Sequence, residues 1–400
     1  MKTESQRGSR PLGLYVHIPF CVRKCAYCDF LSAATPVATQ RRYVAALHRE
    51  IELMAGRPEI SGRHFATLYV GGGTPTVLPP ADLADIIDAC LRRFRFSRAG
   101  SDVDALEVTV EANPGTVTVD GLARLRAAGA NRLSLGVQSF DRTLLAELGR
   151  IHSAADACAA VAAARAAGFA NINLDLMFAL PGQTLAQWTG TLDLAIALEP
   201  EHISAYSLIV EEGTPFYDRD RRGELARPDE ETEAAMYEAA IARLTAAGYH
   251  HYEISNFARP GREARHNLIY WHNDDYLGLG LGAWSYLPRD AAGGRVRDAN
   301  PRDLTAYCES LERGRLPARV DGEMPARRHE LTETIIMGLR LIDGLDLEAF
   351  CERFNIALDD AYPGVRRDLE ALGLVEVVDN RLRLTRRGLL LANRVFAAFV

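Results

Sequence analysis

The segment YVHIPFCVRKCAYCDF, residues 15–30, places three of the chain's seven cysteines within eight positions. It begins inside a short apolar and β-branched run, residues 13–18, which is typical of a buried strand. Cys21, Cys25 and Cys28 have the spacing C-x3-C-x2-C. Three thiolates in one loop can hold three irons of a [4Fe-4S] cluster and leave the fourth iron without a protein ligand. The segment therefore predicts a metal cluster directly after the first strand.

A closed zinc site is the alternative interpretation of the same cysteines. Zinc takes four protein ligands in a tetrahedron, and His17 or His152 could complete a Cys3His set. Structural zinc sites more often come as paired C-x2-C knuckles, so the spacing favours the cluster but leaves zinc open. The other cysteines are scattered through helix-like sequence, where we expect them to be buried small hydrophobic residues: Cys90, Cys158, Cys308 and Cys351.

The composition is that of a soluble globular protein. The 400 residues are 48% hydrophobic and 25% charged, with a formal net charge of −7. A nucleic-acid partner is not expected, because phosphate binding favours a basic field. No apolar run reaches the roughly 18 residues that a membrane span needs, and the first ten residues lack the apolar core of a signal peptide. We therefore expect a cytoplasmic protein.

Apolar and β-branched runs alternate with Ala- and Leu-rich helical stretches, which is the pattern of βα units around a parallel sheet. Six strands are predicted, at residues 13–18, 66–71, 106–112, 132–138, 172–178 and 202–210. Polar or glycine positions stand at the ends of several strands: Gly71 to Thr74, Glu111, Gln138, Asp175 and Tyr206. In a parallel barrel these ends share the face that carries the active site. The prediction is an α/β fold, an incomplete (β/α)6 barrel that is open on one side.

Three regions are expected along the chain. The partial barrel spans residues 10–215, and a barrel extension with an aromatic and histidine-rich segment spans 216–324, including an acidic helix at 228–247 and a loop at 288–298. Residues 325–400 predict a small α+β domain like a winged helix, with a hairpin that turns at Asp379 and Asn380.

A second motif, GGGTPT at residues 71–76, supports the interpretation of the cysteines as cluster ligands. Glycines 71–73 let the backbone approach a polar ligand closely, and Thr74 adds a hydroxyl and an N–H. Together the two motifs resemble the radical S-adenosylmethionine (SAM) superfamily. The resemblance implies that the open iron is chelated by the amino and carboxylate groups of SAM, which an electron from the cluster can cleave to a 5′-deoxyadenosyl radical.

One branch of that superfamily matches further motifs. YVHIPFC, GGGTPT, EANPGT, RLSLGVQSF and NLDLMFALPGQT follow one another as in the anaerobic coproporphyrinogen III dehydrogenase-like family. The resemblance implies first-SAM contacts at Tyr15, Gly72, Thr74, Glu111 and Trp284, and contacts to a second SAM or a substrate at Gly73, Gln138, Arg150 and Asp175. From the residues alone, Glu111 and Asp175 could instead cap helices, and Arg150 could be a solvated cation at a helix end.

Phe30 stands where the dehydrogenase has a fourth cysteine, so the sequence is more similar to the HemW branch of haem chaperones. A second motif of that branch is RHNLIYW, residues 265–271. Haem needs an axial ligand and apolar aromatic walls, which the resemblance assigns to His266, Tyr270 and Trp271. The alternative is that His266 satisfies backbone groups in a turn and the aromatic residues belong to the core. His250, His251 and His272 are rival haem ligands.

The resemblance implies a haem chaperone that binds a [4Fe-4S] cluster, SAM and haem. It would pass haem to haem-requiring acceptor proteins such as respiratory enzymes, with peripheral contact at the inner membrane. A flavodoxin-type electron donor is implied if SAM is cleaved, and a homodimer is a further expectation. The rival functions are oxygen-independent coproporphyrinogen III dehydrogenase and radical SAM methyltransferase.

Overall fold

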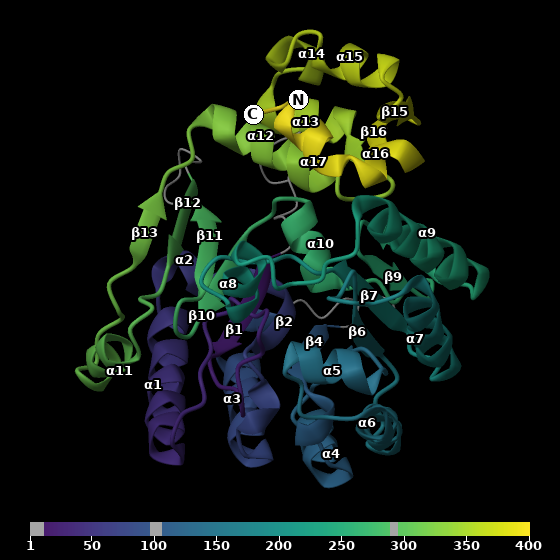
Figure 1. The fold of residues 1–400 in the computed structure, drawn as a ribbon. Helices are drawn as coiled ribbons and strands as arrows, with labels where there is room; N and C mark the ends of the chain where they lie inside the picture. Colours follow the sequence, from purple (N-terminus) through teal and green to yellow (C-terminus); the bar gives the residue numbers. More distant parts are fainter. Residues whose placement is uncertain (1–11, 97–105, 289–294) are drawn as a thin grey trace.

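The computed structural model of the chain describes residues 12–96, 106–288 and 295–400. Its centre is a run of six parallel strands that are hydrogen-bonded to one another in chain order (Figure 1). They are β1 (Leu12–Ile18), β2 (His64–Gly72), β4 (Glu107–Ala112), β5 (Arg132–Gln138), β6 (Ile172–Phe178) and β7 (His202–Ser207). The six predicted strands and the α/β fold class are confirmed. Only the last strand ends earlier than expected.

Helices between the strands bury the apolar face of this sheet. Leu125 on a helix, Leu135 on β5 and Val161 on a further helix belong to one hydrophobic core. Two of the helices begin at a capping box, in which Ser153 pairs with Asp156 and Thr184 pairs with Gln187. The helices of this layer are α1 (Val37–Ala55), α2 (Pro58–Ser61), α3 (Pro80–Arg93), α4 (Val119–Ala127), α6 (Ala154–Ala166), α7 (Leu185–Ala197) and α9 (Glu230–Ala246). Two short helices, α5 (Arg142–Leu148) and α8 (Pro215–Arg221), contribute instead to a separate hydrophobic cluster beside the cysteine loop.

The sheet continues beyond the parallel strands at both ends. On one side β10 (Tyr276–Leu279) pairs with β1 in parallel and is followed by β11 (Trp284–Pro288), β12 (Arg295–Ala299) and β13 (Val320–Glu323). On the other side are β9 (Asn256–Ala258) and β8 (His250–Glu253), and β3 (Arg95–Phe96) pairs with β2.

The prediction of a loop at residues 288–298 is wrong in part. Pro288 closes β11, residues 295–298 lie in β12, and residues 289–294 lie outside the described chain. The guanidinium groups of Arg295 and Arg297 lie 5.4 and 4.8 Å from the ring centre of Tyr286 across the strand pair. Cation–π packing on a neighbouring strand therefore buries charges that the sequence pattern assigned to a loop.

The cysteines outside the cluster loop divide into two groups. Cys90 and Cys308 are buried, as predicted, whereas Cys158 and Cys351 are exposed. The expectation is wrong for these two because each lies on the solvent side of its helix, as Cys158 does beside the buried Ala157 and Ala160 of α6. Their position on an amphipathic helix decides their exposure, and their residue type does not.

The C-terminal module has a hydrophobic core of its own, built around Ile335, Phe350 and Leu382. Its strands form a three-stranded sheet in the order β14–β16–β15. The hairpin turns at Asp379 and Asn380, whose φ angles of 48° and 61° are left-handed, as the predicted two-residue turn requires. The elements are α12 (Arg327–Gly338), β14 (Leu345–Asp346), α13 (Leu347–Phe354), α14 (Leu358–Ala361), α15 (Val365–Ala371), β15 (Val375–Val378), β16 (Arg381–Leu384), α16 (Arg386–Leu390) and α17 (Ala392–Ala397).

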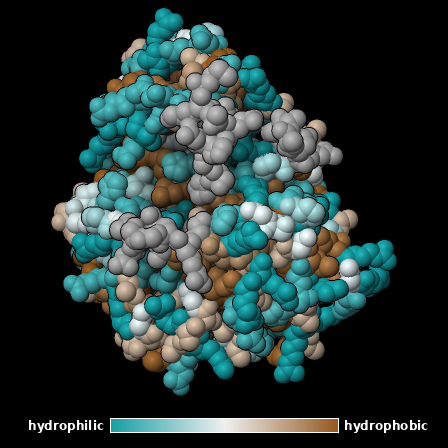
Figure 2. All heavy atoms as spheres, turned by 180° about the vertical axis from the view of Figure 1, so that it is seen from behind, coloured by the Kyte–Doolittle hydropathy of each residue, from teal (hydrophilic) through white to brown (hydrophobic). Residues whose placement is uncertain are grey.

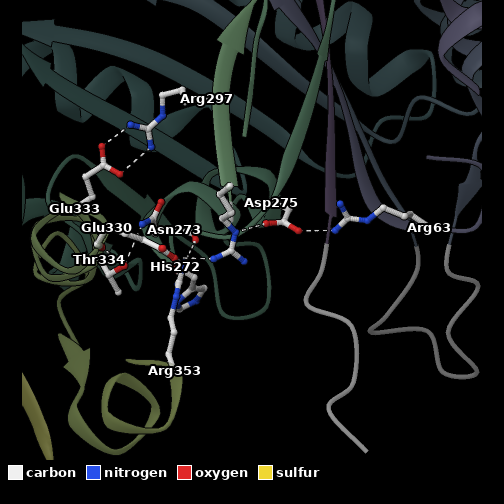
Figure 3. Close-up of polar contacts among 10 residues, drawn as sticks. Arg63, His272, Asn273, Asp275, Arg297, Glu330, Glu333, Thr334 and Arg353 are labelled. Carbon is white, nitrogen blue, oxygen red and sulfur yellow. Dashed lines mark hydrogen bonds and ion pairs between the residues drawn. The ribbon is translucent and has the colours of Figure 1, made fainter. Parts of the chain in front are cut away.

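A chain of ion pairs joins this module to the barrel extension (Figure 3). Glu330 on α12 accepts from Arg295 of β12 at 2.8 Å and from Arg353 of α13 at 3.1 Å. Arg295 also donates to Asp275, which binds Arg63 from the barrel side. These side chains are largely buried, so solvent screens the attractions only partly.

Replacing Glu330 by alanine should lower the free energy of unfolding by about 1–3 kcal/mol, because two guanidinium groups lose a shared carboxylate. Thermal or urea unfolding measures the change. The exposed Glu348 of α13 is the matched control, and its alanine variant should stay within about 0.5 kcal/mol of wild type. Equal stability of the two variants would mean that the ion pairs do not hold the module.

The outer surface mixes polar and apolar side chains. Figure 2 shows hydrophilic residues over most of one face, with hydrophobic ones in smaller groups between them. Within residues 12–96, 106–288 and 295–400, no helix combines the length and the hydropathy that a membrane crossing needs.

Candidate functional site

The face of the parallel strands opposite the helix-covered core is polar. On β5 the side chains of Leu133, Leu135 and Val137 enter the core, while Ser134 and Gln138 face the other way and line a cavity. The same alternation runs along all six strands. A barrel interior is ordinarily filled by branched apolar side chains. This polar lining therefore marks the barrel interior as a binding site.

Two adjoining cavities open from the barrel interior. The first, here called the cysteine cavity, has a volume of about 340 Å³ and is lined by all three cysteines of the loop. The second, the aromatic cavity, has a volume of about 500 Å³. Phe30, Gly72 and Glu111 line both cavities and mark where they meet.

The predicted site residues divide between these two cavities. The cysteine cavity is lined by Cys21, Cys25, Cys28, Gly72, Gly73, Thr74, Glu111, Gln138, Arg150 and Asp175. The aromatic cavity is lined by Tyr15, Gly72, Glu111, Tyr270 and Trp284. His266 and Trp271 are the two predicted residues that line neither of them.

The cysteine loop lies against the glycine-rich turn after β2. Gly73 donates to the carbonyl of Ile18 at 2.9 Å, and Thr74 donates to the carbonyl of Phe20 at 2.7 Å. A Cβ atom at position 73 would lie 2.5 Å from the Phe20 oxygen and 3.0 Å from the Cys21 sulfur. Only glycine allows this approach, so GGGTPT and the cysteine motif form one structural unit.

The guanidinium group of Arg150 lies beside the cysteine thiols and is held there by several hydrogen bonds. Arg150 donates to the Cys25 sulfur at 3.6 Å and to Asn113 Oδ1 at 2.6 Å, and it also bonds the Gly136 carbonyl. The pKa of the Cys28 thiol is raised to about 11, mainly by burial, with smaller contributions from the neighbouring cysteines. A thiol in this environment becomes a thiolate when a metal binds, because the metal charge displaces the proton.

The donor set suits a cluster better than one zinc ion. His17 Nε2 donates to the Leu31 carbonyl and its Nδ1 contacts Tyr15 Oη, both at 2.9 Å, while His152 Nε2 donates to the Val137 carbonyl at 3.0 Å. Both candidate fourth ligands therefore have other partners. In the described part of the chain, no three His, Cys, Asp or Glu side chains converge on one metal position. A [4Fe-4S] cluster bonds its cysteines through separate irons, so they need to surround a volume and not a point.

Glu111 lies between the two cavities. Its carboxylate accepts from Tyr69 Oη at 2.6 Å and from the Gly72 N–H at 3.0 Å. Burial raises the pKa of Glu111 to about 7, although both hydrogen bonds oppose the shift. Neither of the next two described helices after β4 in the chain is capped by the Glu111 side chain. The side chain holds the glycine turn and presents a titratable carboxyl group to both cavities.

Asp175 is held by a network that the sequence analysis missed. It accepts from Ser134 at 3.0 Å and from Asn173 at 2.8 Å, and Asn173 Oδ1 lies 2.6 Å from His202 Nδ1. Burial raises the pKa of Asp175. A signal was present, because polar residues alternate with leucines in RLSLGVQ and NLDLM, although strands of a parallel sheet are usually apolar on both faces.

The H-N-x-x-Y-W segment forms α10 (Arg265–Trp271). Contacts of His266 with Gly13, Thr67 and Glu107 place this helix at the N-terminal ends of β1, β2 and β4, which are the floor of the barrel. His266 is 1% exposed, and its ring nitrogens contact Thr67 Oγ1 at 2.7 Å and Tyr270 Oη at 3.0 Å. Trp271 packs under Arg340 of the C-terminal module, with the guanidinium 4.6 Å from the ring. The three haem candidates thus point toward the barrel floor, the aromatic cavity and the C-terminal module, and His266 as haem ligand stays a prediction.

The rival histidines lie elsewhere. His250 is half-exposed at the edge of the sheet, 3.6 Å from Glu263, and His251 stacks on Phe257 with ring centres 4.3 Å apart. His272 is exposed at the end of α10. Neither of the two cavities is lined by any of the three.

Comparisons with known proteins agree with this geometry. Residues 15–195 match the model of the radical SAM superfamily, and residues 326–391 match that of the HemN C-terminal domain. The solved structure of coproporphyrinogen III oxidase (HemN) from Escherichia coli, a radical SAM enzyme, is similar with a TM-score of 0.79 and 28% identity, covering 98% of this chain and 90% of that one.

Sequence relatives narrow the assignment. Heme chaperone HemW of Bacillus subtilis is 39% identical over 389 residues, covering 96% of this chain and 98% of the relative. Heme chaperone HemW of Mycobacterium tuberculosis strain H37Rv is 39% identical over 390 residues, covering 96% and 94%. Fold and cysteine loop define a radical SAM protein with a HemN-type C-terminal domain. Within that class, the chain belongs to the HemW family of haem chaperones.

Proposed function

We propose that the protein is a haem chaperone that holds one [4Fe-4S] cluster through Cys21, Cys25 and Cys28, binds SAM at the open iron, and carries haem to acceptor proteins. The observation that carries the proposal is that the cysteine cavity and the aromatic cavity share the lining residues Phe30, Gly72 and Glu111. The first cavity has ligands for a cluster, and the second has walls for a flat apolar ligand. The family assignment supports the same functions.

SAM is assigned to the junction of the two cavities. By resemblance Tyr15, Gly72, Thr74, Glu111 and Trp284 contact the SAM that chelates the cluster, and they line the junction and its two sides. In the superfamily, the reduced cluster supplies the electron that cleaves SAM. Gln138, Arg150 and Asp175 lie farther along the cysteine cavity, where they would position a second SAM or a substrate.

Phe30 favours a haem-transport function over the oxidative decarboxylation of coproporphyrinogen III. Its side chain is 62% exposed and lines both cavities at the position of the dehydrogenase's fourth cysteine. It therefore offers a flat apolar wall and no further thiol. Val22, Arg23 and Lys24 are exposed beside the cysteines, so the cluster would lie near the surface, within reach of a flavodoxin-type donor if SAM is cleaved.

Anaerobic reconstitution followed by haem titration tests the function. We expect four irons, four sulfides and about one haem per chain, with transfer of the haem to an apo-acceptor protein. The alternative, oxygen-independent coproporphyrinogen III dehydrogenase, is favoured by the structural similarity to HemN. Conversion of coproporphyrinogen III to protoporphyrinogen IX by the reduced, SAM-supplied protein would establish that alternative, and absence of haem binding would refute the chaperone.

The affinity for SAM should depend on pH through Glu111. Because its pKa is raised to about 7, the carboxyl group is mostly protonated at pH 6 and mostly ionised at pH 8. The ionised form accepts hydrogen bonds from SAM and attracts its positive charge, so affinity should rise by up to about tenfold over this range. Calorimetric titration at several pH values measures the affinity for SAM. The Glu111→Gln protein should show no such rise, and an equal slope in both proteins would contradict the role of Glu111.

A further inference from the structure

A buried carboxyl group on α1 lies behind the wall of the aromatic cavity. Glu50 is 0% exposed and lines neither of the two cavities. Taking a carboxyl group out of water is costly unless hydrogen bonds replace those to water. The groups that bind Glu50 therefore show what its burial achieves.

Three donors from distant segments converge on Glu50. The N–H of Gly280 donates to Oε2 at 2.7 Å, Tyr307 Oη donates to the same oxygen at 2.6 Å, and Asn300 Nδ2 donates to Oε1 at 2.6 Å. Gly280 directly follows β10, Asn300 directly follows β12, and Tyr307 lies on α11 (Leu304–Glu312). One side chain of α1 thus joins three segments that come more than two hundred residues later in the chain.

Two of these segments form one wall of the aromatic cavity. Ala283 and Trp284 line it from the turn between β10 and β11, and Ala299 lines it from the end of β12. The N–H of Asn300 donates to the Ala283 carbonyl at 3.0 Å, which joins the two segments to each other. The backbone that Glu50 binds is therefore continuous with the wall.

The turn is also pressed against β1. Gly280 has a φ angle of 95°, and a Cβ atom there would lie 2.5 Å from Tyr43 Oη and 2.6 Å from the His17 carbonyl oxygen. Tyr43 donates to that carbonyl at 2.6 Å and accepts from the Leu281 N–H at 3.1 Å. Tyr43 and Glu50 are seven residues apart, so they lie on the same face of α1. This face holds the turn at two points.

Building on the proposed SAM site, we propose that Glu50 is a positioning residue of that site: by holding the turn of residues 280–283, it places the Trp284 ring and so sets the affinity for SAM. Trp284 lines the aromatic cavity and is 42% exposed. Because few side chains surround such a ring, the backbone of the turn decides where it lies. A turn fixed in advance reduces the entropy that is lost when SAM binds.

The arrangement of donors predicts that glutamine cannot replace Glu50. Asn300 Nδ2 also donates to the Gly280 carbonyl at 2.8 Å, which fixes the end of its amide that faces Glu50. The Gly280 N–H faces the other oxygen of Glu50. Both oxygens therefore have to accept, whereas one end of a glutamine amide can only donate. Glu50→Gln keeps the size of the side chain and breaks the contact with Gly280 or with Asn300.

Calorimetric titration of the anaerobically reconstituted full chain with SAM tests the proposal. Glu50→Gln should bind SAM about five- to tenfold more weakly than wild type, as expected when one side chain has to be ordered on binding. Iron and sulfide content should be unchanged, because the three partners of Glu50 lie outside the cysteine loop.

Glu201→Gln is the matched control. The Glu201 carboxylate also accepts three hydrogen bonds, two from Arg165 and one from the Ile172 N–H, and it lines neither cavity. The same substitution there should lower the stability of the protein and leave the affinity for SAM at the wild-type value.

A double-mutant cycle tests whether Glu50 acts through Trp284. Trp284→Ala alone should weaken SAM binding. Adding Glu50→Gln to that variant should change the affinity by less than about twofold, because the ring that Glu50 places is gone. A merely structural Glu50 would lower the affinity by the same factor in both backgrounds.

Tyr307→Phe repeats the test with a milder change if Glu50→Gln does not fold. It removes one of the three donors and keeps the ring, which stacks on Tyr43 with centres 5.5 Å apart, and it should also weaken SAM binding. The proposal is overturned if both variants bind SAM like wild type, if Glu201→Gln loses the same affinity, or if the effects of Glu50→Gln and Trp284→Ala multiply. Wild type that holds the cluster but binds no SAM contradicts the proposed function itself.

Discussion

The Cys25→Ala protein, reconstituted under anaerobic conditions, is expected to retain less than about a tenth of the wild-type iron and sulfide. Cys25 is one of three thiols around the cysteine cavity, and its sulfur lies 3.6 Å from Arg150 Nη1. Without it the cluster has two protein ligands, and Arg150 lacks the charge that it faces. Binding of SAM should fall in parallel, since SAM needs the open iron.

Cys158→Ala is the control for this experiment. Cys158 is exposed on α6 and lines neither cavity, so its loss should leave iron, sulfide and SAM binding unchanged. The two variants remove the same chemical group from two places. Equal cluster content in Cys25→Ala and wild type would show that the loop does not hold the cluster through this thiol.

Gly73→Ala is expected to be nearly as damaging, although it removes no ligand. The added Cβ atom would lie 2.5 Å from the Phe20 carbonyl oxygen and 3.0 Å from the Cys21 sulfur, and the first of these is backbone. The loop must therefore move away from the turn. We expect a loss of about 1–3 kcal/mol in the free energy of unfolding, with failure to assemble the cluster.

Gly190→Ala provides the matched control. Gly190 lies inside α7, and a Cβ atom there would meet nothing within 4 Å. Alanine at this position should stabilise the protein by about 0.5–1 kcal/mol, because glycine is unfavourable in a helix interior. Urea unfolding and sulfide content measure both variants. A Gly73→Ala protein as stable and as cluster-rich as the control would contradict the close packing of the two motifs.

The parallel strands could be predicted from sequence because each carries its own local pattern. Residues 132–138 and 172–178 match the predicted bounds, since β-branched and leucine-rich runs are bounded by turn signals. The strands that extend the sheet could not be predicted in the same way. β12 carries Arg297, whose partners Tyr286 and Glu333 lie on the neighbouring strand β11 and on α12, so the pattern of its own segment does not report its burial.

The site could be predicted in part for the same reason. The cysteine spacing and the glycine turn are local motifs, and their residues line one cavity. The contacts of His266 with Thr67 and Tyr69 join residues almost two hundred positions apart, which only the fold brings together. Its contact with Tyr270 was within reach of sequence analysis, because the two residues are four apart. Assigning RHNLIYW to a helix would have revealed the pair.

The most direct test of the account is electron paramagnetic resonance of the anaerobically reconstituted, reduced protein with and without SAM. Cluster ligation by Cys21, Cys25 and Cys28 with one open iron predicts a [4Fe-4S]⁺ signal whose g-values shift when SAM is added. A signal that SAM leaves unchanged would contradict the open iron. A protein without the signal that holds one zinc per chain and no sulfide would contradict the cluster.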